Sequence, residues 1–179
     1  MKVISKIELL LIALWLGAAC FFSLAVAPSV FIVLPSREWA GFVVNRTLTI
    51  INFSGLIISF VLLALSFIPR SETRKIWAWL QRILLLIVGL ACGAGQLIIG
   101  VYLEILRKSS DVPLSQLPAE NSIKMQFDMW HQYSVWVLIA GMVAAFFAFF
   151  VMSRPTLANT PKNKKDDIIP EFEFPDHLK

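Results

Sequence analysis

Residues that build catalytic and metal centres are scarce in this sequence. Its 179 residues include only two cysteines and two histidines, and neither an HExxH motif nor a phosphate-binding glycine loop occurs. Cys20 and Cys92 lie inside apolar blocks, which excludes a disulfide framework and a zinc site and favours small packing residues. Only His131 lies near an apolar block, so one chain lacks the two ligands of a bis-histidine haem bundle. No catalytic residue and no cofactor is predicted.

Charged residues are also scarce, and their placement argues against a nucleic-acid-binding domain. They make up 16% of the chain, whereas 58% of the residues are hydrophobic. The formal charge of +4 comes from residues between and beyond the apolar blocks, which is where a membrane protein keeps its charges. The predicted surroundings are therefore a lipid bilayer, and no nucleic-acid partner is expected.

Long apolar runs dominate the chain instead. A spanning helix needs about 20 mostly apolar residues, and four segments qualify, at about residues 7–34, 48–68, 83–103 and 134–152. The first continues past Pro28 and is therefore longer than the core of a cleaved signal peptide. The fourth helix is expected to begin outside the bilayer, because the stretch after Pro118 already follows a helical spacing.

The predicted fold is all-α, an integral membrane four-helix bundle over residues 1–153. The polar tail over residues 154–179 is broken by four prolines and is typical of a disordered cytoplasmic segment. Lysine and arginine predict the orientation: with four spans, one side holds the N-terminus, the second loop and the tail. That side carries every Lys and Arg except five, which are Arg37, Arg46, Arg107, Lys108 and Lys124. Both termini are therefore predicted to be cytoplasmic, and if the protein is bacterial its membrane is expected to be the cell (inner) membrane.

Small residues form a stripe along each predicted span. Residues three and four apart share one helix face, and small residues let helices approach closely in lipid. In the first span the inward face is expected to hold Ala13, Gly17 and Cys20. Over all four spans the predicted packing glycines are Gly17, Gly55, Gly89, Gly93, Gly100 and Gly141.

Polar residues accompany these stripes mainly in the outer half of the predicted bundle. They are Asn52, Gln96, Glu104, His131 and Ser134. One explanation is hydrogen bonding between helices, worth about 0.6 kcal/mol on average. The other is a small outward-facing site centred on His131, because ionisable groups in membrane segments are often functional. His131 lies at the membrane edge, where water lowers the cost of a charge. The first explanation is therefore favoured, with the imidazole bonded to Glu104, Asn52 or Ser134.

A metal site is a weaker alternative. Met125 and Met129 are four residues apart and share a helix face, and with Asp128 and His131 they would form a loose metal-binding patch. Methionine is an ordinary apolar filler, however, and this spacing is common.

Two motifs resemble those of one family. The first motif comprises Trp15 with Gly17, Phe21 or Phe22, the tripeptide Val26–Pro28, Phe31, Leu34 and Ala40–Gly41. The second places Phe127, His131 and Ser134 in an F-x-x-x-H-x-x-S pattern. Over about residues 5–152 the chain resembles the four-span membrane domain of unknown function 4149, which includes the transmembrane protein 205-like proteins of animals. The family often has an asparagine shortly after the serine, where this chain has Val137 and Leu138. The resemblance implies four helices with both termini on one side, and no established reaction.

Two hypotheses of function follow. The favoured one is a structural or interaction bundle without catalysis, whose partner is another membrane protein or a second copy of the chain. The alternative is a membrane protein that handles a small ligand, metal or solute at an outward-facing site around His131. A stoichiometric bound molecule in the purified protein would favour the alternative.

Overall fold

The computed structural model describes residues 2–68, 75–110 and 112–154, which contain helices and no β-strand. In chain order the elements are α1 (Lys2–Phe21), η1 (Phe22–Val26), α2 (Ala27–Val33), α3 (Arg37–Leu65), α4 (Lys75–Gly93), η2 (Ala94–Gly100), α5 (Val101–Lys108), η3 (Leu114–Gln116) and α6 (Ser122–Ser153). The predicted all-α fold is confirmed. Apart from Arg154, the predicted tail lies outside the described residues.

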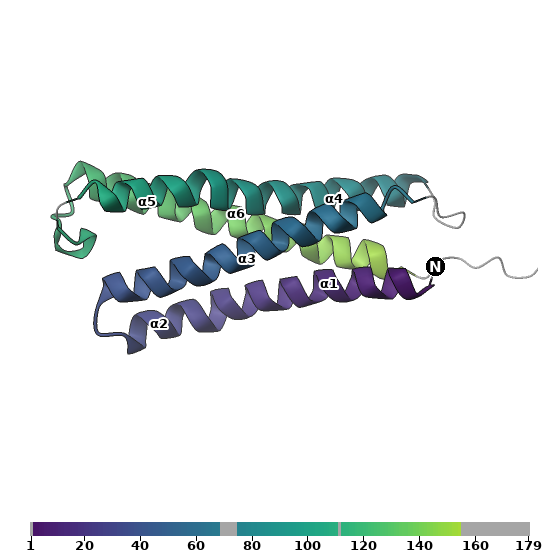
Figure 1. Cartoon of the computed structure of the whole chain (residues 1–179), viewed down its shortest axis with the longest axis horizontal. Coiled ribbons are helices and arrows are strands. Elements are labelled where there is room, and N and C mark those ends of the chain that lie inside the picture. Colours follow the sequence, from purple (N-terminus) through teal and green to yellow (C-terminus); the bar gives the residue numbers. More distant parts are fainter. Residues whose placement is uncertain (1, 69–74, 111, 155–179) are drawn as a thin grey trace, which may run out of the picture.

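Four long helices run side by side along the molecule (Figure 1). The first comprises α1, η1 and α2, the second is α3, the third comprises α4, η2 and α5, and the fourth is α6. Each is long and apolar enough to cross a membrane, so the chain is a multi-pass integral membrane protein. The fourth helix is continuous from Ser122 to Ser153, as the sequence predicted.

The alternating direction of the helices gives the bundle two different ends. The terminal end holds the start of α1, the end of α3, the start of α4 and the end of α6 (Figure 1). The loop end holds the turn between α2 and α3 and the connection between α5 and α6.

Polar caps start two helices before the apolar runs begin. The Ser36 hydroxyl accepts a hydrogen bond from Glu38 N at 3.2 Å, and Asn121 Oδ1 accepts one from Ile123 N at 2.9 Å. Such caps satisfy N–H groups that have no partner within the helix. Consequently α3 begins at Arg37, although the apolar run of the second span begins only at about residue 48.

Pro28 does not end the first long helix. Proline has no N–H to donate to the preceding turn, and the chain widens just before it into the π-helical segment η1, where Ala27 N donates to Phe22 O. The second π-helical segment, η2, lies beside α3. A Cβ built at Gly95 of η2 would lie 3.3 Å from Nδ2 of Asn52. Both irregular segments therefore remain within continuous helices, as single π-helical stretches commonly do.

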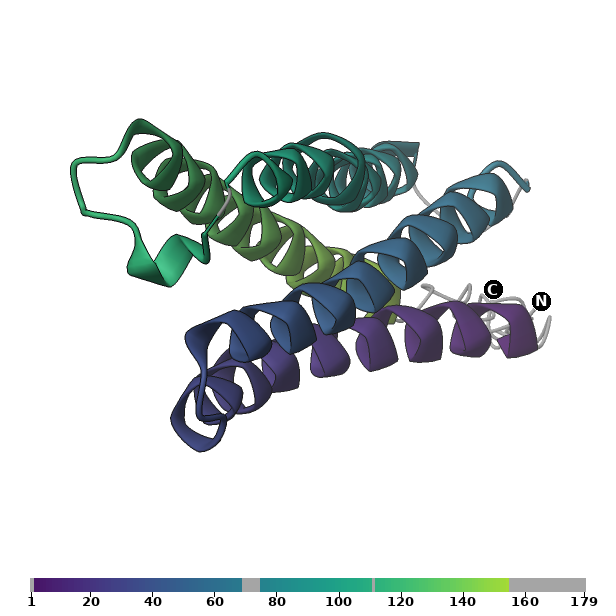
Figure 2. The same ribbon diagram turned by 60° about the vertical axis from the view of Figure 1, so that its left-hand side comes forward.

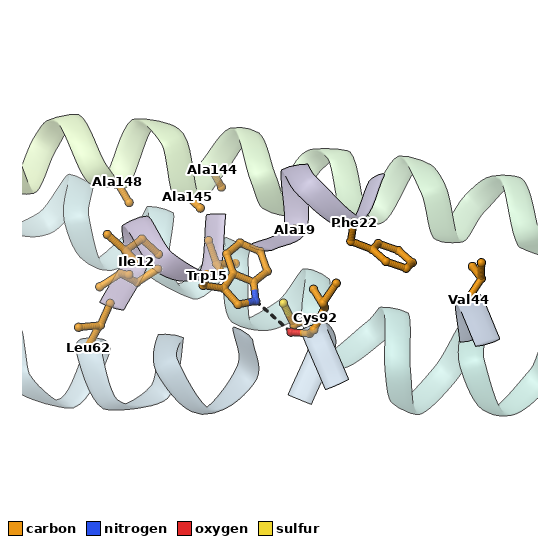
Figure 3. Packing of buried hydrophobic residues seen from close by; sticks show 13 residues of the cluster. Ile12, Trp15, Ala19, Phe22, Val44, Leu62, Cys92, Ala144, Ala145 and Ala148 are labelled. Carbon is orange, nitrogen blue, oxygen red and sulfur yellow. Dashed lines mark hydrogen bonds between the residues drawn. The ribbon is translucent and has the colours of Figure 1, made fainter. Parts of the chain in front are cut away.

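The packing is tightest around Trp15 of α1 (Figure 3). The residue is 3% exposed, and its Nε1 donates a hydrogen bond to the carbonyl of Ile51 at 2.9 Å. Gly55 of α3 leaves room for the ring, because a Cβ there would collide with the indole and lie 2.6 Å from Cys92 Sγ of α4. Gly141 of α6 faces the same ring, which a Cβ there would approach to 3.9 Å. Trp15 thus lies where the four long helices meet, a region we call the Trp15 junction.

Three further predicted packing glycines have different surroundings. A Cβ at Gly89 would lie 2.9 Å from Ser59 Oγ, and one at Gly93 would lie 3.7 Å from a leucine methyl group, both on α3. These two glycines therefore face a neighbouring helix. The nearest atom to a Cβ at Gly100 belongs to its own helix, the carbonyl oxygen of Gly95 at 3.2 Å.

The inward face of the first helix differs from the predicted stripe. Gly17 is exposed, and a Cβ built there would meet nothing within 4 Å. The buried face instead holds Ile12, Trp15 and Ala19. The reason is complementarity: α1 supplies the large ring that fills the space left by the glycines of α3 and α6, and a glycine on α1 at this level would leave a void.

We predict that Gly55→Ala lowers the melting temperature of the purified protein in detergent. The added methyl group overlaps Trp15 and Cys92, and overpacking of this kind costs about 1–3 kcal/mol. Gly17→Ala is the matched control, because the same methyl group there enters open space and should be neutral or slightly stabilising. Equal melting temperatures for Gly55→Ala and the wild type would contradict the packing at the junction.

Candidate functional site

A cavity of about 730 Å³ lies among the helices at the loop end. All four long helices and the connection between α5 and α6 contribute to its walls. Toward this end α2 and α3 diverge from α5 and α6 (Figure 2), and residues of these four helices line the cavity. We call this space the loop-end cavity.

The walls of the loop-end cavity combine apolar and ionisable side chains. The apolar part includes Phe31, Val44, Leu48, Leu103 and Phe127. The ionisable part consists of Arg37, Glu38, Glu104, Arg107, Lys124, Asp128 and His131. With His131 neutral, the cationic and anionic side chains are equal in number, so the cavity is polar without an excess of either sign.

The structure brings together three of the five polar residues singled out in the sequence. Glu104, His131 and Ser134 line the cavity. Asn52 and Gln96 are not part of its walls. Asn52 lies deeper in the bundle, where it is 4% exposed and faces η2.

The metal-binding patch suggested by residue spacing is not assembled around the cavity. Of its four members, Asp128 and His131 line the cavity, whereas Met125 and Met129 are exposed and do not. Over residues 2–68, 75–110 and 112–154, no group of three or more His, Cys, Asp or Glu side chains is placed to hold a metal ion.

His131 contacts an aromatic ring and not the hydrogen-bonding partners expected for it. Its imidazole stacks parallel to the ring of Phe127, with centroids 6.3 Å apart. Within the described part of the chain, the imidazole makes no hydrogen bond to Glu104, Asn52 or Ser134. Ser134 instead donates its hydroxyl to the carbonyl oxygen of His131 at 2.6 Å, a bond within one helix turn. The imidazole is thus part of the cavity edge and does not link two helices.

Sequence reasoning missed several charged residues of this site. Arg107 and Lys124 were used only to predict orientation, yet both line the cavity. The spacing contained a signal: Lys124, Asp128 and His131 follow one another at four and three residues, which places them on one face of α6. A search for ionisable residues at helical spacing next to a span would have found this face.

Two of the charged side chains already have partners. Lys108 Nζ lies 3.3 Å from Glu104 Oε1, and Lys124 Nζ donates to the carbonyl of Leu117 at 3.0 Å. Arg107 is half-buried, with its guanidinium carbon 5.8 Å from the centre of the Phe127 ring. Among the described residues it forms no ion pair.

Next to Trp15, on the side of the terminal end, the interior contains an apolar layer. Ile12, Leu62 and Ala148 lie together on one side of Trp15 (Figure 3), and each is 0% exposed. Ser59 of α3 donates its hydroxyl to the carbonyl of its own helix, at Leu56. The layer of Ile12, Leu62 and Ala148 lies between the loop-end cavity and two buried polar side chains nearer the terminal end, Glu8 and Gln81.

We predict that His131→Leu changes the melting temperature very little. The imidazole makes no hydrogen bond that the substitution would break, and exposed positions of this kind usually change stability by less than about 0.5 kcal/mol. Trp15→Phe is the comparison, because it removes a buried hydrogen bond worth about 1 kcal/mol. A larger loss for His131→Leu than for Trp15→Phe would show that the imidazole has a structural partner.

Comparison with known proteins places the chain in a family. The model of DUF4149, described as a domain of unknown function, matches residues 10–111, which is more than half of the 179 residues. The match covers the first long helix from its third turn, α3 and the third long helix, and it ends before α6. No curated protein matches. No solved structure matches. The chain therefore belongs to the DUF4149 family, which is defined by a domain of unknown function.

Proposed function

We propose that the protein is an integral membrane protein that binds a small amphiphilic molecule in the loop-end cavity. The observation that supports this is the cavity itself, with a volume of about 730 Å³ and walls from all four long helices. Ligand pockets in proteins typically have volumes of about 300–1,000 Å³, apolar walls and a few polar groups that orient the ligand. The combination of Leu48, Leu103 and Phe127 with Arg107 and His131 fits that description.

The cavity favours binding over the purely structural role that the sequence suggested. Helices in lipid associate through close packing, and every unfilled volume removes contacts between neighbouring atoms. A bundle that acts only through packing gains nothing from an open space at one end. A bundle that takes up a ligand needs that space, together with side chains that the ligand can contact.

A binding function also agrees better with the interior than conduction through the bundle does. The buried residues beside Trp15, including Ile12 and Leu62, are apolar and fully buried. Water and ions crossing the bundle would have to pass this layer, where charges are expensive. The proposed ligand therefore enters and leaves at the loop end.

The proposed orientation places the loop end outside the cell. The basis is the excess of lysine and arginine in the segments at the terminal end, which positive-inside reasoning assigns to the cytoplasm. Aromatic partners accompany two of these cations: Arg154 lies over the Trp77 ring at 3.6 Å and Arg82 over the Phe67 ring at 4.4 Å. Such pairs suit the headgroup region of a bilayer. In a bacterium, the membrane would be the inner membrane.

The test of the binding function is to fill the cavity. Leu48→Trp places a larger ring in the cavity wall, whereas Ile50→Trp, two residues along α3, is 60% exposed and directed away from the cavity. The three proteins are purified from membranes in a neutral detergent and examined by native mass spectrometry. We expect a co-purified small molecule on the wild type and on Ile50→Trp, and its loss from Leu48→Trp.

Circular dichroism of each variant checks that the helices are retained. If Leu48→Trp is folded and carries the same molecule in the same amount as the wild type, the loop-end cavity is not the binding site. The same conclusion holds if the wild type carries no small molecule.

The orientation gives a separate prediction. A reporter fused after Lys179 should behave as cytoplasmic, and a reporter inserted near Ser115, in the connection between α5 and α6, should behave as exported. At each position, one reporter that is active only in the cytoplasm and one that is active only after export are compared, which shows on which side of the membrane that position lies. The reverse result at both positions would place the cavity on the cytoplasmic side.

A further inference from the structure

Arg107 is the group in the cavity wall best placed to bind an anion. It is half-buried, and it lies close to α3, because a Cβ built at Gly41 would be 3.5 Å from a terminal guanidinium nitrogen. One turn before it, Glu104 is paired with Lys108 at 3.3 Å. Arg107 itself forms no ion pair over the described ranges of the chain. A guanidinium has five N–H donors, and a partly buried one gains stability from each acceptor that it finds.

The other charges of the cavity are less suited to this role. Lys124 already donates to a backbone carbonyl, and Arg37 is exposed. The carboxylates of Glu38 and Asp128 belong to exposed residues at the edge of the cavity. Water and salt screen such exposed charges, so they oppose an anion at the more buried Arg107 only weakly.

We propose that the ligand of the loop-end cavity is an anionic amphiphile. Its phosphate or carboxylate group binds the guanidinium of Arg107, and its apolar part lies against Phe31, Leu48 and Leu103. Arginine suits this role because its planar fork donates two parallel hydrogen bonds to such oxyanions. The inference rests on the proposed function, since it takes the cavity as the binding site, and adds the chemical class of the ligand.

Three soluble probes test separately whether binding requires the anionic group, the apolar chain or both. Hexyl phosphate carries both the anion and the apolar chain, hexanol carries only the chain, and inorganic phosphate carries only the anion. Each is titrated by calorimetry into the purified full chain in a neutral detergent. We expect hexyl phosphate to bind more tightly than the other two, because it alone contacts Arg107 and the apolar wall together.

The matched variants are Arg107→Gln and Arg46→Gln. Arg46 is also on the loop-end half of the molecule, but it is exposed and does not line the cavity. Removal of a charge-assisted hydrogen bond should weaken hexyl phosphate binding about tenfold or more in Arg107→Gln. Arg46→Gln should bind as the wild type does, and a melting curve for each variant verifies folding.

Three outcomes would overturn the proposal. Hexanol binding as tightly as hexyl phosphate would remove the requirement for an anion. Inorganic phosphate binding as tightly as hexyl phosphate would identify a soluble anion and exclude an amphiphile. Equal hexyl phosphate affinities for folded Arg107→Gln and Arg46→Gln would exclude Arg107 as the anchor. Leu48→Trp tests the cavity separately from the chemistry of the ligand. If one of these three outcomes is found and Leu48→Trp still abolishes binding, the cavity remains the binding site. The proposed function then stands, although the ligand is not an anionic amphiphile held by Arg107.

Discussion

The bundle depends on one large ring held among small residues. In lipid there is no hydrophobic force between helices, so their association depends on close contact and on hydrogen bonds. Trp15 supplies both, because its indole fills the space left by Gly55 and faces Gly141, and its Nε1 donates a hydrogen bond to the carbonyl of Ile51. That hydrogen bond lies in a dry interior, where an unpaired indole N–H would be costly. A single side chain of α1 therefore joins α1 to α3 and α6, while α4 packs directly against α3 and α6.

The tight packing at the Trp15 junction and the cavity at the loop end both follow from the angle at which the helices cross. α6 packs along α4 and also contacts α1, and in Figure 2 it crosses the bundle obliquely. Helices that cross at an angle are close at the crossing and separate on either side of it. Toward the terminal end the gap is filled by side chains such as Leu62 and Leu85. Toward the loop end it remains as the cavity, and the ionisable residues there have access to water.

The sequence was sufficient to predict which segments form helices, but it was insufficient to predict which face of each helix points inward. Apolar runs of spanning length predict four helices, and these are present. Small-residue spacing predicts an inward position for Gly17, Gly55 and Gly141 alike, because the rule treats each helix alone, whereas in the structure Gly55 and Gly141 are buried and Gly17 is exposed. Whether a face turns inward depends on what the opposite helices leave room for, which only the assembled bundle shows. The cavity has the same origin: His131 was noticed for its position, whereas Arg107 joins it only because the helices separate there.

The position of the cavity at one end of the bundle limits the chemistry of the proposed ligand. A guanidinium at the centre of a bilayer is expensive and normally needs a permanent partner inside the protein. At the loop end water lowers this cost, so Arg107 remains half-buried without an ion pair among the described residues. The same level of the bundle provides apolar walls from Phe31, Leu48 and Leu103. Charge and apolar surface coexist stably only near such a boundary, which is also where the polar and apolar parts of a membrane amphiphile are separated. The cavity therefore offers both kinds of surface that a membrane amphiphile needs. Arg107 is available to the polar group of the amphiphile, and the apolar helix walls are available to its chain.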